Sequence, residues 1–153
     1  MSDRFGASLK VRRADYEGDA NLKKLLDQEK PDFEEYGTFM ITDDQARYGE
    51  FDEIETYCFN HGIAFDRWSE SYYEYRSQIR MFRPGATVID KTVYLSSDNG
   101  DPFIECRTVR AILDDASKSE SEKLQKIFEF IQNEDYPCKP IEEYRSPRES
   151  TEE

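Results

Sequence analysis

The residues best suited to acid–base chemistry are three carboxylates in an aromatic segment, Asp66, Glu70 and Glu74. Paired carboxylates are the catalytic groups of glycosidase clefts, where one acid donates a proton and the other acts as base or nucleophile. Such pairs also arise by chance, because 34 of the 153 residues are acidic. A carboxylate-based hydrolase is therefore an alternative interpretation, and a raised pKa on one of these acids is its test.

Other catalytic and cofactor-binding patterns have little support. The only histidine, His61, precedes Gly62 at the expected end of a helix, where the helix dipole favours a cation, so we expect a structural role. Cys58, Cys106 and Cys138 are far apart, and the first two are expected to be small buried residues. The sequence has no glycine-rich phosphate loop and no Gly-x-Ser-x-Gly. We expect no metal, no cofactor and no enzymatic activity.

The distribution of charge is more informative than any motif. The net charge is −13, and two acidic blocks flank a nearly neutral middle. Residues 15–70 hold 16 acidic and 5 basic side chains, residues 71–110 hold 5 and 6, and residues 111–153 hold 12 and 6. Such a field repels nucleic acids and membrane surfaces and attracts basic proteins. We therefore expect no direct nucleic-acid or membrane partner.

The leading interpretation is a non-enzymatic protein that binds a basic protein surface. Acids on and before a helix at 49–61, expected to point into solvent, would make the contact, with nearby aromatic residues as rigid anchors. The predicted partner-binding residues are Asp43, Asp44, Glu50, Asp52, Glu53, Glu55, Trp68, Tyr72 and Tyr73. Carboxylates presented by a folded scaffold have the electrostatics of a nucleic-acid strand, so one form of this function is a mimic that inhibits a nuclease or DNA-binding protein.

In composition the chain resembles small acidic, aromatic-rich inhibitors of phages and mobile elements, such as anti-restriction and anti-CRISPR proteins. The resemblance implies an anti-defence role but assigns no residue. A structural or regulatory domain that forms homodimers through exposed aromatic residues is a further alternative. The absence of an apolar run of about 20 residues and of a signal-like start predicts a cytoplasmic protein.

The alternation of residue types predicts an α+β fold, with a mixed or antiparallel sheet of four to six strands and helices packed on one face. We expect a loose N-terminal arm at 1–18, one domain at 19–135 and a disordered tail at 136–153. Strands are expected at 37–42, 64–68, 79–83 and 87–97, with shorter ones at 9–12 and 72–75. The strand, helix and strand between 37 and 68 have the spacing of a βαβ crossover, or of a split one with another strand between.

Local signals place the ends of several elements. Asp19 is expected to cap a helix at 20–29, and Gly62 to end the helix at 49–61 in a left-handed conformation. Asn99-Gly100 predicts a type I′ hairpin with a return strand at 102–106. Thr108 is expected to cap a helix at 109–115, and Ser119 with Glu122 forms a capping box before a last amphipathic helix.

Overall fold

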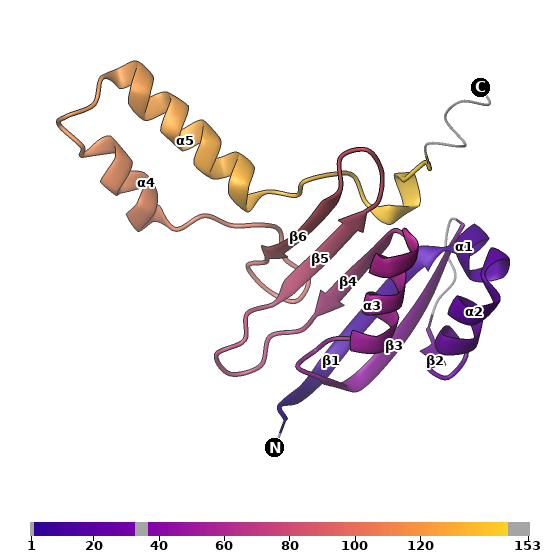
Figure 1. Ribbon diagram of the computed structural model, residues 1–153. Helices are drawn as coiled ribbons and strands as arrows, with labels where there is room; N and C mark the ends of the chain where they lie inside the picture. The colour runs from indigo at the N-terminus through magenta and orange to yellow at the C-terminus, as the bar shows by residue number, and fades with distance from the viewer. Residues whose placement is uncertain (1, 33–36, 147–153) are drawn as a thin grey trace.

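The computed structural model describes residues 2–32 and 37–146. Its core is a six-stranded antiparallel sheet in the order β2-β3-β1-β4-β5-β6, which confirms the α+β class (Figure 1). The strands are β1 (Arg4–Arg12), β2 (Lys30–Pro31), β3 (Thr38–Arg47), β4 (Phe65–Ser69), β5 (Gln78–Arg83) and β6 (Ile89–Tyr94).

Strand β1 corrects the expectation of a loose N-terminal arm, because it lies inside the sheet between β3 and β4. Phe5, Ala7, Leu9 and Val11 alternate with less buried residues, and this period of two gives the strand one fully buried face. Both neighbours run antiparallel to β1, so β3 and β4 are parallel to each other. Strands β3 and β4 are connected by helix α3 (Asp52–His61) and have β1 between them, so the split form of the crossover is the one observed.

Three helices cover one face of the sheet: α1 (Arg13–Gly18), α2 (Ala20–Leu26) and α3 (Figure 1). The expected ends of two of them are confirmed. The Asp19 carboxylate accepts a hydrogen bond from the Leu22 N–H at 2.9 Å, and Gly62 follows α3 with φ of 65°. Leu22 and Leu26 pack into the main core, which α3 enters through Ile54 and Cys58.

The opposite face of the sheet is partly covered by the segment expected to be a disordered tail. Residues 136–146 run back over the sheet and include the short helix η1 (Ile141–Glu143). Ile141 is buried, and Lys10 Nζ on β1 lies 2.6 Å from Glu142 Oε1. The rest of the expected tail, 147–153, lies outside the described residues.

The region after β6 departs most from the expectation. Asn99 and Gly100 are not among the residues with positive φ, so the turn is not type I′, and Pro102 makes only an isolated bridge with Leu95 instead of starting a strand. The next helix, α4 (Cys106–Leu113), begins before Thr108 and leaves Cys106 exposed. The capping of α5 (Glu120–Glu134) by Ser119 is confirmed.

Helices α4 and α5 form an antiparallel hairpin that projects away from the sheet (Figure 1). No residue of either helix is buried, so the expectation that the helices pack on one face of the sheet holds only for α1, α2 and α3. Within the described part of the chain, no helix is both long enough and apolar enough to cross a membrane.

Candidate partner-binding surface

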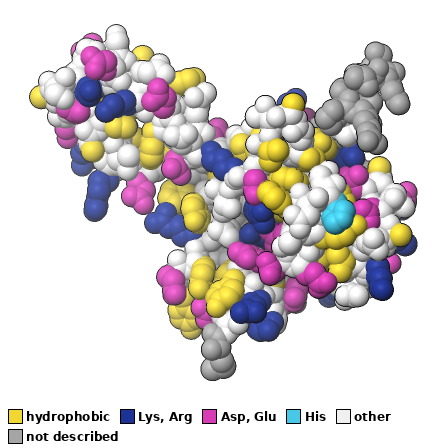
Figure 2. All heavy atoms as spheres, in the orientation of Figure 1, with side chains coloured by type: hydrophobic (Ala, Val, Ile, Leu, Met, Phe, Trp, Pro, Cys, Tyr) yellow, Lys and Arg dark blue, Asp and Glu magenta, His cyan; other side chains and the backbone are white. Residues whose placement is uncertain are grey.

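Four of the predicted contact acids line one small hollow at the start of α3. Asp43 comes from β3, Glu50 from the turn that follows it, and Asp52 and Glu53 from the first turn of α3. Glu29, just after α2, completes the set around a cavity of about 170 Å³. These five carboxylates are called the acidic hollow below. Figure 2 shows acidic side chains gathered over this part of the molecule.

The acidic hollow carries largely uncompensated negative charge. Glu50 Oε1 lies 3.9 Å from Arg67 Nη2, a weak contact. The other four carboxylates have no Lys, Arg or His within ion-pairing distance among residues 2–32 and 37–146. Burial raises the pKa of Glu29, and the charge of Asp43 raises it further. Glu29 and Asp43 therefore repel each other across the hollow, and a cationic partner would relieve that repulsion.

Glu55 corrects the expectation of an outward-facing acid, because it is buried under α3. Its Oε1 accepts hydrogen bonds from Arg67 Nε at 3.0 Å and Arg80 Nη1 at 3.2 Å, and its Oε2 accepts one from the Phe51 N–H at 2.6 Å. Arg67 also donates to Ser69 Oγ. Glu55 is thus the centre of a buried network that holds the start of α3 on the sheet, and it is not available to a partner.

Asp44 and Trp68 face the other side of the sheet. Successive residues of a strand point to opposite faces, so Asp44 turns away from Asp43 and lines a separate cavity with Trp68 and Glu70. Lys10 Nζ lies 5.5 Å from the centroid of the Trp68 ring. These two predicted contact residues are therefore not part of the acidic hollow.

The remaining predicted anchors, Tyr72 and Tyr73, belong to an aromatic cluster at the end of the sheet. Tyr72 stacks on Phe5 with ring centroids 5.3 Å apart, and Tyr73 packs edge-on against Tyr72 at 4.7 Å. Tyr75 packs against both Phe5 and Tyr48, at 5.2 and 6.4 Å. These five rings are called the aromatic cluster, which is visible beside the acidic side chains in Figure 2.

Two residues of the aromatic cluster have strained backbones. Tyr48 and Tyr73 are the only non-glycine residues with positive φ in the described ranges, at 53° and 50°. A left-handed conformation costs a residue with a Cβ about 1–2 kcal/mol, and such strain is concentrated at functional sites. Tyr73 is also 88% exposed, so the fold presents one ring to solvent at the tip of the turn.

The turn at 48–50 joins the two surfaces. Tyr48 contributes to the aromatic cluster and Glu50 to the acidic hollow. Gly49 between them has φ of 66°, and a Cβ there would clash with the ring of Phe5. Glycine is therefore required for this close approach. Arg47 lies over the Tyr48 ring, with 5.6 Å from Cζ to the centroid, and marks the positive border of the surface.

The carboxylates considered for catalysis are not brought together. Asp66 has no exposed surface and pairs with Arg83 at 2.8 Å beneath Ile141. Burial raises its pKa, which is the signature sought for a general acid, but the group is sealed from solvent. Glu70 is at the far end of β4, where its Oε1 accepts a hydrogen bond from the Gly6 N–H, and Glu74 lies exposed in the following turn.

His61 has the structural surroundings expected of it. It lies in the last turn of α3, its ring stacks on Tyr57 at 3.9 Å, and its Nδ1 lies 2.9 Å from the Tyr57 carbonyl oxygen. In the described ranges, no group of three or more His, Cys, Asp or Glu side chains is arranged to hold a metal ion.

Four residues of this surface were not predicted from the sequence. Glu29 enters the acidic hollow through the packing of α2 beside α3, and no local pattern relates it to Asp52 or Glu53. Phe5, Tyr48 and Tyr75 join the aromatic cluster because β1 begins between β3 and β4. The Tyr48-Gly49 pair was the one available signal, since a glycine before a helix marks a tight turn.

Comparison of the chain with protein families, with curated proteins and with solved structures found no match.

Proposed function

We propose that this protein is a non-enzymatic binding protein whose acidic hollow and aromatic cluster together engage a basic surface of another protein. The observation that carries the proposal is the set of five carboxylates around one concavity, four of them without a cationic partner in the described part of the chain. Protein surfaces ordinarily mix the two signs of charge, so a same-sign concavity favours a ligand of opposite sign.

The aromatic cluster supplies binding affinity that the acidic charge alone does not provide. Acidic contacts steer association and set its salt dependence, whereas packed rings such as tyrosine supply most of the affinity at interface hot spots. Tyr73 is held by Tyr72 and by its own backbone, so little conformational entropy is lost when a partner covers it. The partner is therefore expected to carry Arg or Lys side chains beside an apolar patch.

A nucleic-acid-binding protein is the partner class that fits this charge best. Its binding groove is basic because it neutralises phosphates, and a carboxylate-lined surface on a rigid scaffold competes for the same groove. On this proposal the protein acts as an inhibitor by occupying the groove, in the manner of anti-defence proteins. Added duplex DNA would then displace it.

The test reverses the charge of the hollow. A Glu50→Lys, Asp52→Lys, Glu53→Lys variant should lose at least about 100-fold in affinity for a basic protein captured by the wild type at low salt, because three attractive contacts become repulsive. Affinity is measured by titration at several salt concentrations. Reversal at the N-terminus of α3 costs about 0.3–1 kcal/mol per residue through the helix dipole, so folding is checked by circular dichroism.

The matched control makes the same change in net charge elsewhere. Asp114, Glu129 and Glu143 are exposed residues outside the surface, and their reversal to Lys should weaken binding only about threefold through the overall field. Equal losses in both variants would show that net charge alone matters and would reject the site. Binding that is indifferent to duplex DNA would reject mimicry and leave only acidic recognition.

A further inference from the structure

The α4–α5 hairpin exposes a continuous apolar stripe. Leu124, Phe128 and Ile131 on α5 are 69%, 56% and 43% exposed, and Leu113 at the end of α4 is 52% exposed. Two other apolar side chains of α5, Ile127 and Phe130, are half-buried, and Lys123 Nζ donates to the Leu113 carbonyl oxygen at 2.8 Å. Leu124, Phe128 and Ile131 are thus the more exposed part of the apolar face of α5.

The residues around the stripe are those of an interface. At 100° per residue, the uncharged Ser121, Gln125 and Gln132 fall along one edge of the stripe, and the exposed Glu120 lies on the stripe face one turn before Leu124. The charged residues Glu122, Lys126 and Glu129 fall on the opposite side of α5. An apolar centre with an uncharged polar edge, and charge only at one end, is typical of a surface that becomes buried, whereas a solvated helix carries charge all round.

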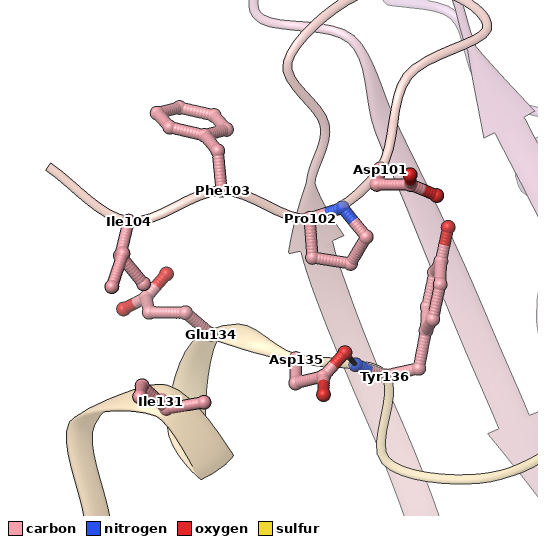
Figure 3. A pocket seen from close by; sticks show the side chains of 8 residues that line it. All are labelled: Asp101, Pro102, Phe103, Ile104, Ile131, Glu134, Asp135 and Tyr136. Carbon is pink, nitrogen blue, oxygen red and sulfur yellow. Dashed lines mark hydrogen bonds between the residues drawn. The ribbon is translucent and has the colours of Figure 1, made fainter. Parts of the chain in front are cut away.

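A second hollow lies at the base of the hairpin. The segments leaving and re-entering the sheet, 101–104 and 131–136, enclose a cavity of about 360 Å³ (Figure 3). Its apolar lining includes Pro102, Ile104, Ile131 and Tyr136. Ile131 belongs to both features, so the apolar surface runs from the stripe into this cavity.

Charge indicates what covers the stripe. Residues 106–134 hold 5 basic and 6 acidic side chains, so the hairpin contributes only −1 to the net charge of −13. Two copies of this chain repel each other through their acidic bodies but not through their hairpins. Because the hairpin projects away from the sheet, two copies can meet there while the bodies stay apart (Figure 1).

The stripe is also nearly symmetrical about Phe128, with Leu124 four residues before it and Ile131 three residues after. We infer that a second copy of this chain covers it, with the two α5 helices antiparallel about a two-fold axis near Phe128. Leu124 of each copy then packs on Ile131 of the other. Such a pairing is self-complementary, as a two-fold interface requires.

The area suits a weak, reversible dimer. Because a free side chain of this size presents on the order of 200 Å², the four exposed residues offer about 400 Å² of apolar surface per chain. Stable interfaces bury ~800 Å² per partner, about twice this apolar area, so the pairing is expected to be weak. We expect a dissociation constant in the micromolar range.

Sedimentation velocity of the full chain between about 1 and 200 μM tests the inference. The wild type should shift from monomer to dimer. Leu124→Glu and Ile131→Lys should each weaken association at least about 50-fold. Each substitution is present in both copies, so the dimer would have to bury two charges. Asn133→Glu, which makes the same change as Leu124→Glu on the opposite side of α5, should leave the dimer intact. Because Leu124 is exposed, its replacement leaves the fold unchanged by circular dichroism.

Mixing the two stripe variants tests the antiparallel pairing directly. In a mixed dimer Glu at 124 meets Lys at 131, while the second contact keeps its Leu and Ile, so association should recover to within about tenfold of the wild type. A wild type that stays monomeric at the highest concentration would overturn the inference and leave the stripe for a different protein. Failure of the mixed pair to associate would overturn the pairing.

Discussion

Replacing Glu55 by Ala should lower the free energy of unfolding by about 3–5 kcal/mol, the usual cost of removing one partner from a buried ion pair. Arg67, 3% exposed, would keep its charge with distant Glu50 as its one remaining carboxylate among residues 2–32 and 37–146, and the Phe51 N–H would lose its acceptor. Urea denaturation followed by circular dichroism measures the change. Because a domain is stable by only about 5–15 kcal/mol, this loss is a large part of the total.

Two control variants separate burial of charge from other causes. Glu53→Ala removes an exposed acid from the same helix and should change stability by less than about 0.5 kcal/mol. Glu55→Leu combined with Arg67→Met replaces the pair by apolar side chains and should recover most of the loss, because no charge is left unpaired. A Glu55→Ala protein as stable as Glu53→Ala would show that the network contributes nothing.

This network also bears on the proposed function. The hydrogen bond from Phe51 to Glu55 and the one from Ser69 Oγ to the Gly49 carbonyl oxygen fix the turn that presents Glu50 and the first turn of α3. Loss of Glu55 should therefore weaken partner binding even though Glu55 touches no partner. The double replacement should restore stability more fully than binding, since it does not rebuild the hydrogen bond from the Phe51 N–H.

The second large effect is expected at Asp66. Asp66→Ala should cost about 3 kcal/mol, because Arg83 would stay charged and 4% exposed, and its remaining acceptors in the described part of the chain are the carbonyl oxygens of Phe65, Phe82 and Lys139. The same change frees the Ile141 N–H, which donates to Asp66 Oδ2 at 2.9 Å. Hydrogen exchange at Ile141 should accelerate together with the loss of stability. Asp44→Asn, an exposed site, is the control for both readouts.

The pH dependence of this site has a definite sign. Burial raises the pKa of Asp66 above its ordinary value of 3.8, and the Arg83 charge offsets part of that rise. The folded state therefore keeps the Asp66 proton at pH values where the unfolded chain has lost it. The stabilisation that comes from this retained proton is full below the ordinary pKa and is lost as the pH rises through the raised one, whereas the contacts of the carboxyl group with Arg83 and the Ile141 N–H remain.

Asp66→Asn isolates this contribution, because Asn can still accept from the Ile141 N–H but does not titrate. The stability difference between the wild type and this variant should be largest near pH 4 and should shrink as the pH rises toward 7. Urea denaturation at both pH values measures it. A difference that grows with pH would show that the ion pair with Arg83 outweighs burial.

The sequence by itself determined the features that depend on neighbouring residues. The caps at Asp19, Gly62 and Ser119 follow from side chains within a few positions of each helix end, and the structure has all three. The spacing of strand, helix and strand was enough to predict a split crossover as one of two arrangements. The concentration of acids before and within α3 is also a property of the sequence alone.

The tertiary structure decided what no local pattern contains. Glu55 was expected to point into solvent, although periodicity puts it on the same face of α3 as Phe51 and Cys58; only the sheet brings Arg67 and Arg80 to meet it. Likewise, the alternation in β1 shows that one face is buried but not that β1 lies inside the sheet. A pattern of burial specifies a face, whereas the partner of that face comes from residues distant in sequence. For the same reason the stripe on α5 is evident in the sequence, and what covers it is decided by charge and shape in three dimensions.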